Sequence, residues 1–257
     1  LYRRLMLGLG NSVASASYSG ELYPAGAFVF TVKTDNTGTS NDDQFLLSES
    51  GTNDYDVDWG DDSTNSGVTS NTTHTYSSSG TYTITITGSD NIGIHFGNAN
   101  DKLKVLEILQ WGNMTIGGAA FYGCANMTSS ATDTPLITTG DWRNAFRNCS
   151  NWNEDVSNWD VTSITNISNW CLGASSFEGA GLGTWDITGV TAASNFMVAG
   201  AMTQANYDDM LIGWDTRTGY NSIAISVGST NFSAGAAATA KTSLTSKGIT
   251  FTDGGQA

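Results

Sequence analysis

Alternation of apolar and polar positions dominates residues 27–88. Three short segments, 27–33, 55–62 and 81–88, carry an apolar or aromatic side chain at every second position, and the last alternates Tyr or Ile with Thr. Period-two patterning with β-branched and aromatic residues predicts strands that bury one face. The gaps hold Asn, Asp, Gly and Ser, which favour turns, and no helical pattern interrupts them. This arrangement predicts an antiparallel β-sandwich.

The stretch YDVDWGDDSTNSGVTSNTTHTYSSSGTYTITITG, residues 55–88, carries three recognisable phrases. They are W-G-D-D at 59–62, H-T-Y at 74–76 and G-T-Y-T-I at 80–84. In this combination the stretch resembles the PKD domain, an immunoglobulin-like sandwich of surface proteins. Asp62 stands where the family commonly has glycine. The resemblance implies an immunoglobulin-like fold displayed outside the cell.

A repeat of about 25 residues follows the strand region. AFYGCANM at 120–127 is echoed by AFRNCSNW at 145–152, by WCLGASSF at 170–177 and by FMVAGAMT at 196–203. The predicted repeat-core residues are the anchors Phe121, Phe146, Cys171 and Met197, with Trp159 and Trp185 in the same frame. A period of roughly 20–29 residues is typical of leucine-rich repeats, whose units stack because none can bury its own apolar face.

The unit AFRNCSNWNEDVSNWDVTSITNISNWC, residues 145–171, resembles the repeat of BspA-like leucine-rich-repeat surface proteins. The next unit, 171–197, resembles it more loosely, because Glu178-Gly179-Ala180 replaces the usual N-x-D phrase. The resemblance covers roughly residues 100–200. It implies a short solenoid on the surface of a cell or particle.

The repeat period breaks near residue 200. From Tyr207 to Trp214, apolar residues recur at helical spacing, which predicts a helix with Thr203 as its N-cap. Residues 234–248 predict a second helix, and 249–253 a final strand. An open solenoid end needs covering, so this segment is predicted to be a cap.

The fold class predicted from these patterns is mostly β with short helices. An N-terminal arm (1–24) precedes a PKD-like β-sandwich (25–90). A BspA-like repeat solenoid (91–200) and an α/β C-terminal cap (201–257) complete the chain.

Net charge narrows the choice of partners. At pH 7 the formal charge is −14, and the one dense basic pair is Arg3-Arg4. Nucleic acid and anionic membranes require clustered Lys and Arg, so both are excluded as partners. No apolar run reaches the roughly 18 residues of a membrane span, so membrane insertion is not expected.

The first residues allow two interpretations. A basic start, a short apolar stretch and Ala14-Ser15-Ala16 together suggest a secretory signal peptide. The alternative is an ordered docking arm, which would use Tyr2, Arg3, Arg4, Leu5 and Leu7.

Catalytic motifs are missing from the sequence. It contains two His, His74 and His95, to which we assign structural roles, and no nucleophile-elbow, zinc-protease or P-loop phrase. Cys124, Cys149 and Cys171 lie in or beside anchor positions, which favours buried thiols; a Cys124–Cys149 disulfide is the alternative. We therefore predict that the protein is not an enzyme.

Two binding features remain as hypotheses. Asp56, Asp58, Asp61 and Asp62 crowd one strand and its turn, so calcium is the one candidate cofactor, with a solvated acidic face as the alternative. Five Trp in the repeats, Trp142, Trp152, Trp159, Trp170 and Trp185, would form a sugar-stacking platform if exposed. We favour the alternative that they fill the core.

The functional hypothesis is a non-catalytic, surface-displayed adhesion or structural protein. The first version is a phage virion component, such as a capsid decoration, fibre or receptor-binding protein, docked through residues 1–24. The alternatives are a bacterial secreted or cell-surface adhesin and a carbohydrate-binding module of a glycan-degrading system. Expected partners are proteins on a particle or cell surface, glycans, and further copies of the same chain. The expected location is extracellular in every case.

Overall fold

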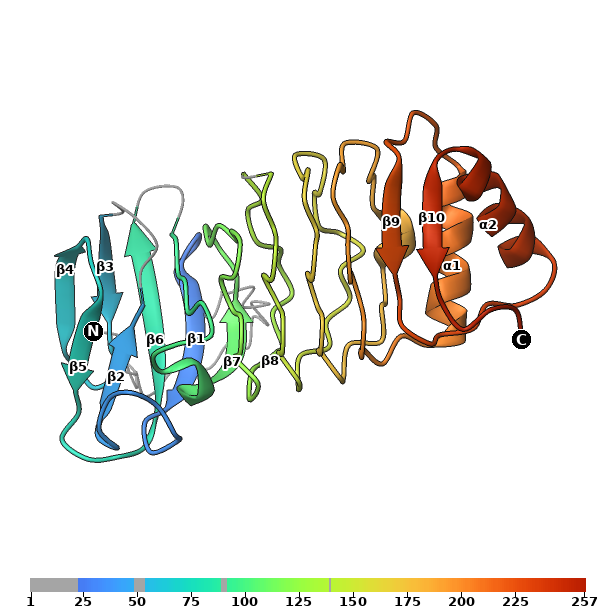
Figure 1. Ribbon diagram of the computed structural model, residues 1–257. Coiled ribbons are helices and arrows are strands. Elements are labelled where there is room, and N and C mark those ends of the chain that lie inside the picture. The colour runs from blue at the N-terminus through green and yellow to red at the C-terminus, as the bar shows by residue number, and fades with distance from the viewer. Residues whose placement is uncertain (1–22, 49–53, 89–91, 139) are drawn as a thin grey trace, which may run out of the picture.

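The computed structural model describes residues 23–48, 54–88, 92–138 and 140–257. The molecule is elongated, with a sheet region at one end, narrow coils in the middle and two helices at the other end (Figure 1). The fold is mostly β with two short α-helices, as the sequence predicted. Its strands are β1 (Phe28–Lys33), β2 (Gln44–Leu47), β3 (Tyr55–Asp58), β4 (Thr64–Val68), β5 (Thr72–Thr75), β6 (Thr81–Gly88), β7 (Val105–Gln110), β8 (Thr128–Ser129), β9 (Ile223–Ser226) and β10 (Ile249–Thr252). Its helices are the 3-10 turns η1 (Lys102–Lys104) and η2 (Leu182–Thr184) and the α-helices α1 (Gln204–Asp215) and α2 (Ala236–Ser246).

The N-terminal region contains a six-stranded sheet in the order β4-β3-β6-β1-β7-β8 and a two-stranded sheet of β2 and β5. The alternating segments predicted from the sequence form β1, β3 and β6, and their apolar positions point into one core with Trp59 and Phe45. This arrangement is consistent with an immunoglobulin-like PKD domain. A register irregularity between β3 and β4 disrupts the edge of the larger sheet, and such bulges protect edges from strand addition.

Strand β7 belongs to both parts of the molecule. It pairs antiparallel with β1 of the sheet and parallel with β8, which lies in the first coil of the repeats. From the sequence, these residues are predicted to belong to the repeat segment, 91–200. In the structure the sheet passes into the coils through β7, without an intervening linker.

The repeats form coils that are hydrogen-bonded in parallel. Each of the first three anchors donates its backbone N–H to the carbonyl of the residue directly before the next anchor: Phe121 to Ala145, Phe146 to Trp170 and Cys171 to Phe196. Parallel bridges join Asp141 to Asn166 and Asn166 to Ala192 on another side of the coils. All four anchors and both Trp of the repeat frame are buried. Residues that recur in the sequence therefore occupy equivalent places on successive coils.

The coils turn through left-handed residues at equivalent positions. Asn144, Asn169 and Asn195 have φ of 60°, 55° and 52°. Asn tolerates this conformation better than most residues. The side chain of Asn195 donates to the side-chain oxygen of Asn169 at 3.1 Å, so the amides also contact each other from coil to coil.

Helices α1 and α2 and the parallel pair β9–β10 cover the C-terminal end (Figure 1). The predicted N-cap is confirmed, because the Thr203 hydroxyl accepts from the Asn206 backbone N–H at 3.2 Å. Asp253 ties the last strand to both helices through an ion pair with Lys241 and a hydrogen bond from the Tyr207 hydroxyl. No helix in the described ranges is long and apolar enough to span a membrane.

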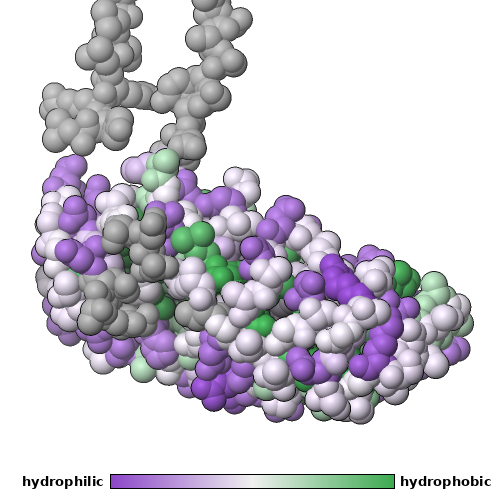
Figure 2. All heavy atoms as spheres, turned by 90° about the horizontal axis from the view of Figure 1, so that it is seen from above, coloured by the Kyte–Doolittle hydropathy of each residue, from purple (hydrophilic) through white to green (hydrophobic). Residues whose placement is uncertain are grey.

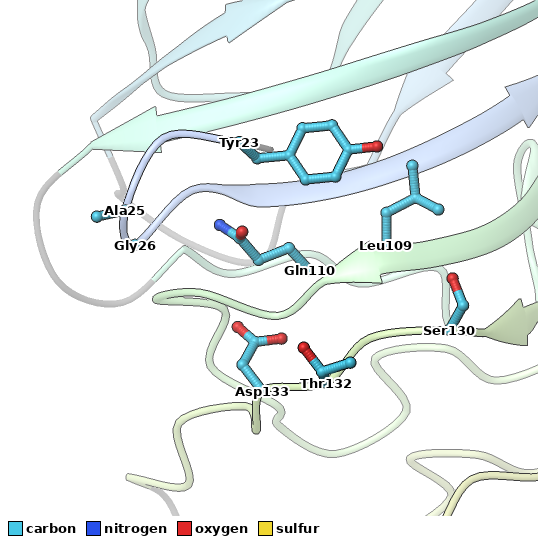
Figure 3. Close-up of a pocket in the computed structure, with 8 residues that line it drawn as sticks. All are labelled: Tyr23, Ala25, Gly26, Leu109, Gln110, Ser130, Thr132 and Asp133. Atoms are coloured by element: carbon cyan, nitrogen blue, oxygen red, sulfur yellow. The ribbon is translucent and has the colours of Figure 1, made fainter. Parts of the chain in front are cut away.

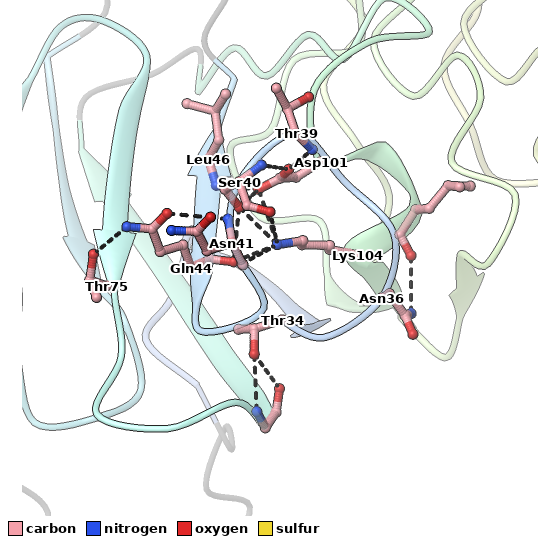
Figure 4. A network of polar contacts seen from close by, with 12 residues as sticks. Thr34, Asn36, Thr39, Ser40, Asn41, Gln44, Leu46, Thr75, Asp101 and Lys104 are labelled. Carbon is pink, nitrogen blue, oxygen red and sulfur yellow. Dashed lines mark hydrogen bonds and ion pairs between the residues drawn. The ribbon is translucent and has the colours of Figure 1, made fainter.

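One fully buried charge pair fixes a long loop against η1. The Asp101 carboxylate accepts from the backbone N–H groups of Thr39, Ser40 and Leu46. The Lys104 ammonium, 3.9 Å from Asp101, donates to three backbone carbonyls of residues 40–44 (Figure 4). Both charges are thus satisfied by the loop that they hold, as buried charges require.

Candidate functional site

A hollow lies where the sheet meets the first repeat coil (Figure 3). It has a volume of about 480 Å³, within the range of small-molecule sites. Its lining comes from three separate segments: the turn before β1, the end of β7, and the loop after β8. The lining residues are Tyr23, Ala25, Gly26, Leu109, Gln110, Ser130, Thr132 and Asp133.

One wall of this hollow is apolar and the opposite wall is polar. Figure 3 shows the Tyr23 ring on one side and Ser130, Thr132 and Asp133 on the other, with Leu109 and Gln110 between them. Hydrogen bonds hold two of the polar side chains, Gln110 and Asp133, in place. The Gln110 amide nitrogen donates to the Pro24 and Ala27 carbonyls at 2.9 and 2.8 Å.

The Asp133 carboxylate is fixed by two backbone groups of the neighbouring coil. Its oxygens accept from the N–H of Trp111 at 2.9 Å and of Gly112 at 2.7 Å. The Trp111 indole in turn donates to Glu154 at 3.0 Å. Burial raises the pKa of Glu154 despite this hydrogen bond. No pattern in the sequence predicted this hollow, because its walls come from segments up to 110 positions apart.

The side chains of His74, Asp61 and Ser63 contact one another but do not form a catalytic triad. In a triad the carboxylate and the hydroxyl bind opposite ring nitrogens. Here Asp61 at 2.9 Å and the Ser63 hydroxyl at 3.4 Å both face Nε2 of His74. The His74 ring stacks on Trp59 with centroids 4.8 Å apart, which is consistent with the structural role expected for His74. His95 is exposed and lies outside the named strands.

The three cysteines are free and buried. Burial raises the pKa of each thiol. The Cys149 thiol donates to the Phe121 carbonyl at 3.0 Å, and the Cys171 thiol to the Phe196 carbonyl at 3.4 Å. A buried thiol with a raised pKa is a poor nucleophile. The alternative disulfide between Cys124 and Cys149 is absent from the structure.

The four carboxylates of the candidate calcium site do not converge. Asp56 accepts from the Gly67 N–H, Asp58 from the Gly60 N–H, and Asp61 from Ser63. Asp62 is exposed and has φ of 69°, a conformation that suits the glycine usual at this place in PKD domains. In the described part of the chain, no group of three or more His, Cys, Asp or Glu side chains could hold a metal ion.

The hypothetical Trp platform is not on the surface. All five Trp of the repeats are at most 5% exposed, so they belong to the core. The face drawn in Figure 2 is largely polar, with small, scattered apolar spots. The candidate docking-arm residues Tyr2, Arg3, Arg4, Leu5 and Leu7 lie outside the described residues.

Two regions of the chain match known families. Residues 29–105 match the PKD domain, and residues 118–239 match the family described as "Mycoplasma protein of unknown function, DUF285". Both are typical of extracellular or surface proteins. The chain thus contains a PKD region followed by a DUF285 region, which belongs to a repeat family related to the BspA-like leucine-rich repeats. No curated protein and no solved structure matched the chain.

Proposed function

We propose that this protein is a non-catalytic adhesin secreted by a bacterium or displayed on its surface. In this proposal an immunoglobulin-like sandwich continues into a short leucine-rich-repeat-type solenoid, which the C-terminal helices close. The two matched families support the cell-surface alternative better than the phage virion component, for which neither match offers support.

The parallel ladder of coils is the observation that carries this proposal. It supports a rigid body whose sides are free to contact a partner, as in other stacked-repeat proteins. The cysteine thiols and the His74 imidazole, which could otherwise act as catalytic groups, make structural contacts within this body. The thiols are buried among the anchors, and His74 is stacked on Trp59 and bonded to Asp61.

Charge favours a partner unlike the chain itself. Two copies, each with a net charge of −14, repel each other at long range. A basic protein or a neutral glycan on a target surface avoids this repulsion. We therefore favour a basic protein or a neutral glycan as the partner over further copies of the same chain.

Display on a non-adherent bacterium tests the proposal. The full chain is fused to a surface anchor, and adhesion to epithelial cells, to other bacteria and to polysaccharide-coated plates is counted. A strain carrying the anchor alone is the control. We expect at least a tenfold gain on one of these surfaces. Equal adhesion of the two strains on every surface would refute the proposal.

A further inference from the structure

We propose that the hollow between Tyr23 and Asp133 binds one neutral sugar ring of a surface glycan. This inference rests on the proposed adhesive function and names the ligand class. The argument uses the two walls of the hollow, the bonding of its polar groups and its position between the sheet and the repeats.

The apolar wall suits the flat carbon face of a pyranose. Tyr23 offers an aromatic ring together with a hydroxyl, and Leu109 and Ala25 extend the apolar surface beside it. Aromatic residues with a polar end are common where a ligand is apolar on one face and hydroxylated at its rim. A fully apolar ligand would leave the opposite wall without partners.

The polar wall presents groups that suit hydroxyls. In the described ranges, no hydrogen bond engages the side-chain hydroxyls of Ser130 and Thr132, and both residues are exposed. The Gln110 amide is held by its nitrogen, and its side-chain oxygen accepts no hydrogen bond from the part of the chain that the structure describes. Each can bond a sugar hydroxyl, which both donates and accepts.

The same bonding argues against a cation as the ligand. Asp133 is the one carboxylate of the lining, and its two oxygens already accept backbone N–H groups. It retains lone pairs for a hydroxyl, but part of its charge is compensated. A neutral, hydroxyl-rich ring therefore fits the hollow better than an ammonium group or a metal ion.

The hollow is also held rigid before any ligand binds. Gln110 joins the turn before β1 to the end of β7, and Asp133 joins the loop after β8 to Trp111 and Gly112. Ligand binding would not need to order these side chains, which limits its entropic cost.

A printed array of neutral mono- and oligosaccharides, probed with the full chain, tests the inference. Hits are then titrated by calorimetry against Tyr23→Ala and Thr132→Ala. We expect one or more hits, with affinity reduced at least tenfold by Tyr23→Ala and at least threefold by Thr132→Ala. Tyr122→Ala and Thr250→Ala are matched controls away from the hollow, and they should bind as the wild type does. Thermal melts verify that each variant is folded.

The outcomes separate this inference from the proposed function. An array without hits, or hits that Tyr23→Ala and Thr132→Ala leave unchanged, would overturn the sugar site. If the displayed chain still adhered to cells, the adhesive function would stand without it. Loss of adhesion in the displayed Tyr23→Ala strain, alongside loss of array binding, would support both.

Discussion

Phe121 and Phe146 are 25 positions apart in the sequence, yet their rings stack with centroids 5.7 Å apart and planes inclined by 17°. The same relation recurs one coil later. Trp152 stacks on Phe177 at 4.7 Å, and Trp170 on Phe196 at 5.5 Å. The repeat in the sequence is thus a repeat of aromatic contacts along the coils.

Replacing Phe146 tests how much these stacked rings, called the aromatic column below, contribute to stability. Its ring contacts Phe121, Trp152 and Trp170, so Phe146→Ala leaves a cavity that the neighbouring coils cannot fill. We expect the free energy of unfolding to fall by roughly 3–5 kcal/mol. Urea denaturation measures it. Arg143→Ala, on the exposed side of the same coil, should cost less than about 1 kcal/mol, and equal losses would contradict the column.

Two features favour glycine at position 173: its left-handed backbone conformation and the closeness of the Asn148 side chain. Its φ is 76°, and a Cβ would lie 2.4 Å from the Asn148 side-chain oxygen. Gly173→Ala should therefore cost the roughly 1–2 kcal/mol of the left-handed conformation plus a smaller excess for moving the Asn148 amide. Gly219→Ala, with φ of 85° and open space around it, measures that conformational part. If Asn148→Gly does not relieve the excess, the contact is not its cause.

Lys104 tests the buried charge pair. Lys104→Met keeps the volume but leaves three carbonyls and Asp101 without their cation. We expect a loss of roughly 3–5 kcal/mol in the free energy of unfolding, measured by chemical denaturation. Lys33→Met removes an exposed ion pair with Asp35 and should cost at most about 1 kcal/mol. A stable Lys104→Met variant would show that the loop does not need the ammonium.

Asp61 makes the free energy of unfolding depend on pH in the acidic range. Burial alone would raise its pKa, but hydrogen bonds from Ser63 and His74 outweigh burial and lower it below the usual 3.8. Its contribution is therefore complete above pH 3.8 and is lost as the pH falls through the lowered value. Unfolding curves of the wild type and Asp61→Asn should converge below this pH. Asp62→Asn is the exposed control, and a gap that persists in strong acid would count against the assignment.

The cysteines should not react in the native protein. Burial raises the pKa of all three thiols, so a disulfide reagent that reports thiolate should find almost none in minutes. In guanidinium it should find three. One thiol after unfolding would indicate a Cys124–Cys149 disulfide, and fast native reaction would indicate an accessible nucleophile.

Local patterns predicted much of this fold because they are local in origin. Alternation located β1, β3 and β6, and helical spacing located α1 with its Thr203 cap. The second helix was predicted over 234–248 and runs from Ala236 to Ser246. The anchors could be read because each coil repeats the same burial requirement.

Features that join distant segments left no such pattern. Asp101 and Lys104 look like surface charges in the sequence, and their burial depends on a loop about 60 positions earlier. The residues of the proposed sugar site carry no motif, because a hollow made by three segments imposes no spacing on any one of them. The double pairing of β7 was hidden for the same reason.

That double pairing has a mechanical consequence. Strand β7 is hydrogen-bonded to β1 on one side and to β8 on the other. A force applied to either half is therefore transmitted through backbone hydrogen bonds and not through a flexible linker. The two halves cannot swivel independently. A target bound at the C-terminal end would therefore be held at a fixed distance and orientation from the PKD region.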